Sequence, residues 1–127
     1  MSLLESLIIE GTINTPSVIF DTEKNTFKIS GKSMPEDSVE FYKPIEEWVD
    51  VFGNSPIPKA KFEIRLEYFN TASSKLILGI IKKIGLSSKD ILIDWYYMDD
   101  DEDMEEIGEH LASILGKDVV NIILLEE

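Results

Sequence analysis

Two apolar periodicities alternate along this chain, and their alternation restricts the fold more than any other feature of the sequence. Apolar side chains occupy every second position over residues 62–68, as in a strand with one buried face. Over residues 76–84 they recur at the three- and four-residue spacing of a helix. A strand at 91–97, a helix at 104–115 and a strand at 119–125 repeat this alternation. Because strands that alternate with helices favour parallel neighbours, we expect an α/β fold with right-handed crossovers.

The beginning of the chain has short apolar runs separated by turn residues, with no helical pattern between them. We expect strands at 7–10, 17–21 and 26–30, with the last two joined in a hairpin through residues 23–25. The predicted order is therefore β-β-β-α-β-α-β-α-β. It corresponds to a mixed sheet of about six strands with an N-terminal antiparallel hairpin and three main helices packed on it.

The segment Ser33-Met34-Pro35-Glu36 has the features of a helix start. It carries the serine and glutamate of a capping box, with proline near the first helical position. Apolar residues follow at helical spacing as far as Phe52. We therefore predict that the first helix begins within this segment.

Size, charge and cysteine content exclude several classes of function. With 127 residues, 43% of them hydrophobic, the chain has the size and apolar content of one domain, which we assign to residues 1–127. Its formal net charge is −13, and affinity for nucleic acids and anionic membranes comes largely from Lys and Arg, so we expect neither as a partner. The absence of cysteine excludes disulfides, thiolate zinc sites and thiol nucleophiles. Since neither an export signal nor a long uncharged apolar segment is recognisable, we expect a cytoplasmic protein.

Three hydroxyl side chains cluster where the strand at 62–68 passes into the helix at 76–84, in the segment Asn70-Thr71-Ala72-Ser73-Ser74-Lys75. The first backbone N–H groups of a helix lack partners within the helix and favour negative charge. A phosphate on Thr71 could therefore be bound by these amides and by Lys75. A hydroxyl at an N-cap also has an ordinary structural role, which contributes about 1 kcal/mol. Spacing alone leaves both interpretations open, and the structural one is the commoner.

The acidic run Asp99–Glu106 suggests a calcium site but matches one incompletely. Asp99, Asp101 and Asp103 occupy the first three ligand positions of an EF-hand loop, whereas Met104 stands where that loop requires glycine. Acidic residues at the start of a helix are also favoured by the helix dipole. The run is therefore better explained as a solvated helix start, although it could also recognise a partner.

His110 is the only histidine, and Glu106 and Ser113 lie on the same predicted helical face. Three residues along one helix do not easily present an accessible nucleophile and an oxyanion hole, so this set is a weak candidate for a hydrolase. No glycine-rich phosphate loop follows a predicted strand. We therefore predict a protein without enzymatic activity and without a cofactor.

Several short segments, taken in their order and spacing, resemble the SiaC family of bacterial regulatory phosphoproteins. Together they cover most of the chain. They are Asn14-Thr15-Pro16-Ser17-Val18-Ile19-Phe20-Asp21, Ile29-Ser30-Gly31-Lys32-Ser33-Met34-Pro35-Glu36-Asp37, Glu40-Phe41-Tyr42, Pro44, Trp48, Tyr68-Phe69-Asn70-Thr71-Ala72-Ser73-Ser74-Lys75 and Asp94-Trp95-Tyr96-Tyr97.

The resemblance implies a STAS-like fold, related to that of sulfate transporters and anti-sigma-factor antagonists, and it implies that Thr71 is the phosphoacceptor. It also implies three protein partners: a dedicated protein kinase, a PP2C-type phosphatase that reverses the modification, and a diguanylate cyclase effector of biofilm control. In the family the unmodified form binds and activates the cyclase. The residues that the resemblance places around the phosphosite or on the partner surface are Asn70, Ser73, Ser74, Lys75, Pro35 and Glu36.

The resemblance is weaker beside Pro35 and Glu36. The family commonly has tyrosine before this pair and asparagine after it, where this chain has Met34 and Asp37. The details of partner recognition at that surface therefore stay open. The alternative function is an acidic cation-binding domain, or an interaction domain that works without phosphorylation.

Overall fold

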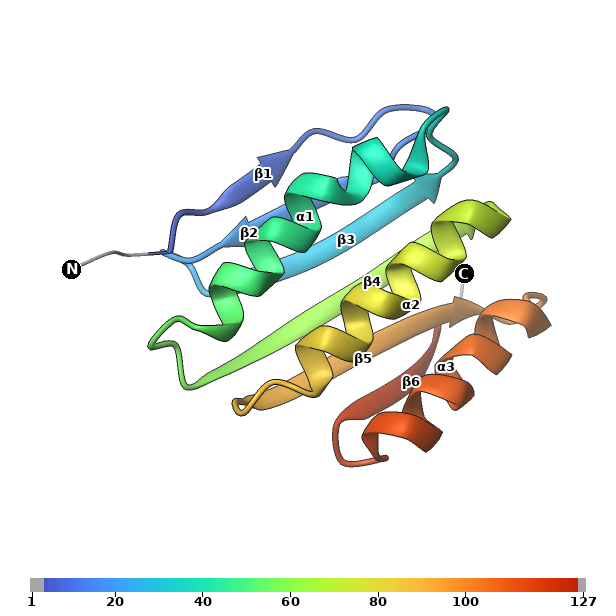
Figure 1. Cartoon of the computed structure of the whole chain (residues 1–127). Helices are drawn as coiled ribbons and strands as arrows, with labels where there is room; N and C mark the ends of the chain where they lie inside the picture. The colour runs from blue at the N-terminus through green and yellow to red at the C-terminus, as the bar shows by residue number, and fades with distance from the viewer. Residues whose placement is uncertain (1–3, 126–127) are drawn as a thin grey trace.

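The computed structural model describes residues 4–125, in which a six-stranded sheet carries three helices (Figure 1). The order of the elements is the predicted one. Their bounds are β1 Leu7–Ile9, β2 Ser17–Asp21, β3 Thr26–Ser33, α1 Ser38–Gly53, β4 Lys59–Phe69, α2 Thr71–Gly85, β5 Asp90–Met98, α3 Glu102–Leu115 and β6 Val120–Leu125.

The strands lie side by side in the order in which they occur in the sequence. β1, β2 and β3 are antiparallel neighbours, whereas β3, β4, β5 and β6 are parallel to one another. Each parallel connection contains one helix, and the three helices lie on the same face of the sheet (Figure 1). The mixed sheet with its antiparallel beginning confirms the predicted fold class; the more specific STAS-like relationship stays a prediction.

The core lies between this face of the sheet and the helices. Inward-facing residues of the strands alternate with outward-facing ones, as Phe62, Ile64 and Leu66 do in β4. Aromatic rings fill the part beneath α1, where Trp48 stacks on Phe52 with ring centroids 5.3 Å apart. Both residues are buried. None of the helices described is both long enough and apolar enough to cross a membrane.

The predicted start of the first helix is wrong, because the chain is still extended at Ser33. β3 continues to this residue, and α1 begins only at Ser38. The cap is Asp37, whose side chain accepts a hydrogen bond from the backbone N–H of Glu40 at 3.1 Å. The Ser33 hydroxyl cannot cap a helix because it is fully buried and bonded to other side chains. A local capping-box pattern was thus overridden by tertiary packing.

The carboxyl ends of the parallel strands and the starts of all three helices lie at one end of the molecule, on the right in Figure 1. The loop before β2 also reaches this end, since the backbone N–H of Met34 donates to the carbonyl of Asn14 at 2.7 Å. In open α/β sheets, binding sites gather at this end. The predicted phosphosite segment lies here as well.

Candidate functional site

Helix α2 begins at the predicted phosphosite segment, and its cap is an amide side chain. Asn70 is the N-cap, and its Oδ1 accepts a hydrogen bond from the backbone N–H of Ser73 at 2.9 Å. The interpretation of Thr71 as an ordinary hydroxyl cap is therefore wrong. Thr71 is instead the first residue of the helix, and it is exposed. Its hydroxyl is not needed to begin the helix.

The remaining donors of this helix start face outward. The Asn70 carbonyl accepts from the N–H of Ser74 at 3.0 Å, and the Ser74 hydroxyl donates to the Thr71 carbonyl at 2.7 Å. Within residues 4–125 the N–H groups of Thr71 and Ala72 have no such partner. Lys75 is exposed one turn into the helix. The accessible part of the site is therefore Thr71, two free amides and one ammonium group.

The three helix starts at this end differ in charge. α1 is capped by Asp37 and has Glu40 in its first turn. α3 is capped by Asp101 and has three further carboxylates in its first turn. The neutral Asn70 caps α2, whose first turn contains no acidic residue. Of the three helices, α2 is thus the one whose first turn has no carboxylate to offset the partial positive charge of the helix dipole.

Beneath Thr71 lies a buried hydroxyl cluster made of Ser33, Ser38, Tyr42 and Ser73. The Ser33 Oγ lies 2.6 Å from the Tyr42 hydroxyl and donates to the Ser73 Oγ at 3.0 Å, and Ser38 lies 3.3 Å from Ser73. Burial raises the pKa of the Tyr42 phenol to about 12, and the smaller effect of its hydrogen bond with Ser33 opposes this rise. The cluster joins the end of β3 to the starts of α1 and α2. It therefore fixes their relative positions beneath the site.

The loop between β3 and α1 lies beside this cluster, and only part of it is accessible. Glu36 is exposed, whereas Pro35 is buried, so Pro35 shapes the surface from below. Ser73 is likewise buried. Large apolar side chains are exposed nearby: Val39 has 67% of its surface exposed, and Tyr68, at the end of β4, has 51%. This end of the molecule therefore exposes apolar side chains as well as the Glu36 carboxylate.

Thr71 also borders a groove between α2 and α3, with a volume of about 440 Å³. We call it the Thr71 groove. Phe69 and Ile107 supply apolar surface, and the α3 side carries two carboxylates and the imidazole of His110. Its lining residues are Phe69, Asn70, Thr71, Ser74, Asp103, Glu106, Ile107 and His110. A negative group added to Thr71 would therefore lie beside the carboxylates of Asp103 and Glu106.

The other two sequence candidates have structural explanations. Asp101 caps α3 by accepting from the N–H of Met104 at 3.0 Å, so the acidic run is a helix start. Among residues 4–125, no group of three or more His, Asp or Glu side chains is placed to hold a metal ion. Ser113 donates its hydroxyl to the backbone carbonyl of His110 at 2.7 Å, and both side chains are exposed on the helix surface. Neither arrangement resembles a catalytic site.

Two features of the site were missed from the sequence. The hydroxyl cluster was missed because Ser33 matched a cap; its place at the end of a strand with inward-facing Phe27 and Ile29 was the available signal. The Thr71 groove joins residues about thirty positions apart, and no local pattern indicates that contact.

Comparison with known proteins gives consistent results. A protein of Pseudomonas aeruginosa strain UCBPP-PA14, which is described as uncharacterized, is 29% identical over 112 residues, covering 84% of this chain and 86% of the relative. The crystal structure of apo-SiaC from P. aeruginosa matches with a TM-score of 0.75 and 25% identity, covering 99% of this chain and 100% of that one.

A second crystal structure contains the diguanylate cyclase SiaD in complex with its activator SiaC, also from P. aeruginosa. A chain in it matches with a TM-score of 0.83 and 24% identity, covering 94% of this chain and 99% of that one, which shows the shared fold. The model of the SiaC family of regulatory phosphoproteins matches residues 9–124. Because that match covers most of the described elements, this chain belongs to the SiaC family of regulatory phosphoproteins.

Proposed function

We propose that this chain is a non-enzymatic switch in which reversible phosphorylation of Thr71 controls binding to protein partners. The observation that carries the proposal is the chemistry of the α2 start. Thr71 is exposed, the N–H groups of Thr71 and Ala72 have no hydrogen-bond partner among residues 4–125, and the first turn contains no carboxylate. Among the three helix starts at this end, it is the one that best stabilises an added negative charge.

The phosphoryl group changes the surface without requiring a new fold. It adds roughly −1.5 to −2 charges and three acceptor oxygens, which the two free amides and Lys75 can bind. The hydroxyl cluster beneath holds α1 and α2 in place, because Ser73 bonds to Ser33 at 3.0 Å and both side chains are buried, whereas Thr71 is exposed. The main change is therefore in the charge and shape of the exposed end.

Carboxylates on α3 would repel the phosphate added to Thr71. In the Thr71 groove the phosphate would lie near Asp103 and Glu106, so its charge adds to a region that is already negative. A partner that approaches the unmodified groove with a Lys or Arg side chain would meet carboxylates and a small hydroxyl. After modification it would meet a bulky dianion in the same space. The two states thus offer different fits to the same partner.

Membership of the SiaC family supports the choice of partners. A protein kinase would transfer the γ-phosphoryl group of ATP to the Thr71 Oγ1, releasing ADP and a proton. A PP2C-type phosphatase would hydrolyse the phosphate ester and restore the hydroxyl. The unmodified chain would bind and activate a diguanylate cyclase-like effector, and Glu36, Asn70, Ser74 and Lys75 are the accessible residues that we assign to this surface.

The acceptor can be tested by mass spectrometry after incubation with ATP and the kinase of the same organism that modifies this chain. We expect one phosphate on Thr71, none on Thr71→Ala and retained modification of Thr71→Ser. Ser113 is a matched internal control, because it is also an exposed hydroxyl on a helix. Modification of Thr71→Ala at the wild-type rate would refute the assignment.

The effect on partners requires chain that is phosphorylated at Thr71. Calorimetric titration with a diguanylate cyclase of the same organism should give saturable binding to the unmodified chain and at least about tenfold weaker binding after modification, since a desolvated charge mismatch costs more than 1.4 kcal/mol. Cyclase activity should fall in parallel. Equal affinity of both forms would leave a constitutive interaction domain as the function.

A further inference from the structure

The two edges of the sheet are protected differently. β1 is an edge strand of three residues, Leu7–Ile9. The opposite edge strand, β6, has six residues with no charged side chain and no proline. Its pairing with β5 runs from Val120 to Leu125 without a register shift. Proteins normally shorten, charge or distort such edges, because an unprotected one can pair with another chain.

The free backbone groups of β6 can be identified. The N–H of Ile93 in β5 donates to the carbonyl of Val119 at 2.8 Å. Because backbone groups alternate along a strand, those of residues 121, 123 and 125 also face β5, and those of Val120, Ile122 and Leu124 face outward. The Val120 N–H is taken by the Gly116 carbonyl at 3.1 Å. No strand among residues 4–125 pairs with the other groups on this side.

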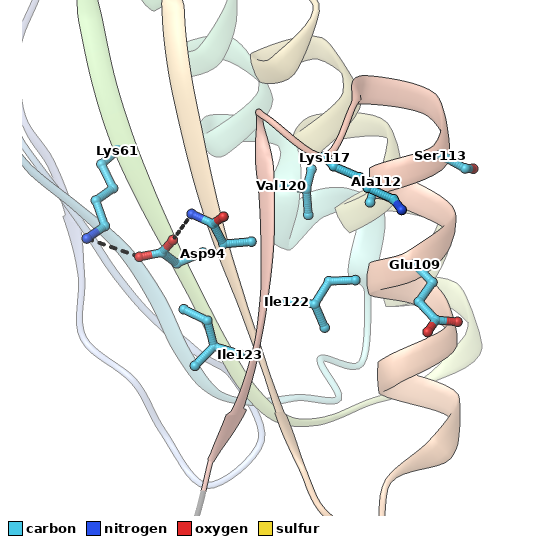
Figure 2. A pocket seen from close by; sticks show the side chains of 10 residues that line it. Lys61, Asp94, Glu109, Ala112, Ser113, Lys117, Val120, Ile122 and Ile123 are labelled. Atoms are coloured by element: carbon cyan, nitrogen blue, oxygen red, sulfur yellow. Dashed lines mark hydrogen bonds and ion pairs between the residues drawn. The ribbon is translucent and has the colours of Figure 1, made fainter.

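A groove of about 910 Å³ runs along this edge, and we call it the β6 groove. Figure 2 looks onto the edge, with lining side chains on both sides of β6. On the α3 side the surface is apolar around Ala112, Val120 and Ile122. On the other side lie Lys61, Asp94 and Ile123. An extended segment placed on the edge would direct alternate side chains to these two sides.

The charges of the groove indicate what can fill it. Asp94 is already neutralised, with Lys61 Nζ at 3.1 Å and Asn121 Nδ2 at 3.1 Å. Glu109 on α3 and Lys117, which follows that helix, are both exposed at the groove, and neither has an ion-pair partner among the described residues. A second copy of this chain is a poor occupant, because each copy carries a net charge of −13 and the two would repel. A basic segment of another protein is complementary to Glu109 and to the chain as a whole.

We propose that the β6 groove binds an extended segment of a protein partner as a seventh strand. The segment has small apolar side chains at alternate positions and a Lys or Arg that pairs with Glu109. Backbone hydrogen bonds to Ile122 and Leu124 supply affinity, and the apolar and acidic positions supply selectivity. The site is distinct from the phosphorylation switch, because the β6 groove and the Thr71 groove share no lining residue.

The probe is an acetylated and amidated heptapeptide, TVTKTVT, whose valines and lysine share the face that turns toward α3. It is titrated into the full isotope-labelled chain and followed by amide NMR spectra. We expect saturable shifts at millimolar peptide, confined to β6 and to the face of α3 around Ala112. Two analogues are then compared, each N-methylated along one of the two edges of the peptide. Because an added strand pairs through one edge, one analogue should bind like the parent and the other about tenfold more weakly.

Two protein variants test the charge. Glu109→Lys should weaken binding of this peptide several-fold and should favour the TVTETVT peptide instead. Glu47→Lys is the matched control, because it makes the same change of charge at an exposed position on α1. It should affect the two peptides much less. The Thr71→Ala variant should bind both peptides as the wild type does, which separates this proposal from the phosphorylation switch.

Three results would overturn the proposal. One is the absence of saturable shifts on β6 at millimolar peptide. Another is equal binding, or equal loss of binding, by the two methylated analogues. The third is a concentration-dependent dimer of the unliganded chain that buries β6, which would assign the edge to a second copy.

Discussion

Helices α2 and α3 begin at the same end of the sheet, and both follow directly from a parallel strand, yet their first turns carry opposite charge properties. α2 is capped by the neutral Asn70 and has hydroxyls and Lys75 around it. α3 is capped by Asp101 and has Glu102, Asp103 and Glu105 in its first turn. The positive end of the α2 dipole is therefore available to an added anion, whereas carboxylates already neutralise the positive end of the α3 dipole. The fold supplies two equivalent positions, and the side chains decide which can be a switch.

The two helix starts are also attached to the sheet by different chemistry. The start of α2 is held through the hydroxyl cluster, where Ser73 reaches Ser33 at 3.0 Å. α3 packs closely on the Trp95 ring, which leaves no room for a Cβ at Gly108, and the Trp95 indole N–H also donates to the Met104 carbonyl at 2.8 Å. A polar attachment depends on geometry and on protonation, whereas an apolar one depends on close packing. Three predictions test these differences in attachment and in charge.

The largest contrast between α2 and α3 should come from glycine substitutions, whose effects on the free energy of unfolding should have opposite signs in the two helices. A Cβ added at Gly108 in α3 would lie 2.6 Å from Trp95 Cδ1, whereas one added at Gly79 in α2 would have nothing within 4 Å. We expect Gly108→Ala to lower the free energy of unfolding by about 1–3 kcal/mol through overpacking. Gly79→Ala should raise it by up to about 1 kcal/mol, because alanine is the better helix former. Chemical denaturation measures both, and equal effects would show that α3 is not held by close packing.

High pH should loosen the attachment of α2 and spare that of α3. Burial raises the pKa of Tyr42 to about 12 from 10.0, so the native state holds this proton more tightly than the unfolded chain. The stabilisation is complete below pH 10 and is lost as the pH rises through 12. The rise of the pKa from 10.0 to about 12 corresponds to about 2–3 kcal/mol.

Tyr42→Phe is the control for this effect. It should be less stable than the wild type at pH 9, because it loses the hydrogen bond to Ser33. Near pH 12 the difference in the free energy of unfolding between the two proteins should become smaller or change sign, because phenylalanine has no proton to lose. Denaturation at several pH values measures the difference. A constant difference between the two proteins would contradict the assigned origin of the pKa.

The smallest effect should be a coupling across the Thr71 groove. Thr71→Glu places a negative charge at the favourable α2 dipole and beside Asp103, so the two contributions should largely cancel. Combining it with Asp103→Asn should stabilise the chain by a few tenths of a kcal/mol more than the sum of the single changes. Asp118→Asn, an exposed change outside this groove, is the control and should be additive. Additivity of both pairs would mean that α3 does not oppose charge at Thr71.

The elements that the sequence predicted correctly are those with a sustained period. β4 alternates with a period of two over most of its length, and α2 has a continuous apolar stripe, so both were found with the correct type and order. Ends were harder. Ser33 and Glu36 match a capping box, but the packing of Ser33 against Tyr42 extends β3 and moves the helix start to Ser38.

The site was predictable in part for the same reason. The segment Asn70–Lys75 is contiguous, so its position at a helix start followed from the adjoining strand and helix. That Asn70 is the cap and Ser73 is buried depends on the hydroxyl cluster, which joins three elements. The approach of Asp103 to Thr71 depends on how α3 packs beside α2. Contacts of this kind leave no local sequence pattern.

The buried hydroxyl cluster has a consequence for how the exposed end can be read by another molecule. By joining Ser33, Ser38 and Ser73, it brings residues 34–39 and 70–75 onto one continuous surface, although residues 40–69 separate the two segments in the chain. A protein that contacts both segments recognises a conformational epitope. A short synthetic peptide that copies residues 66–78 would present the same hydroxyls without that epitope, and it should be a poor substitute for the folded chain in any assay of recognition.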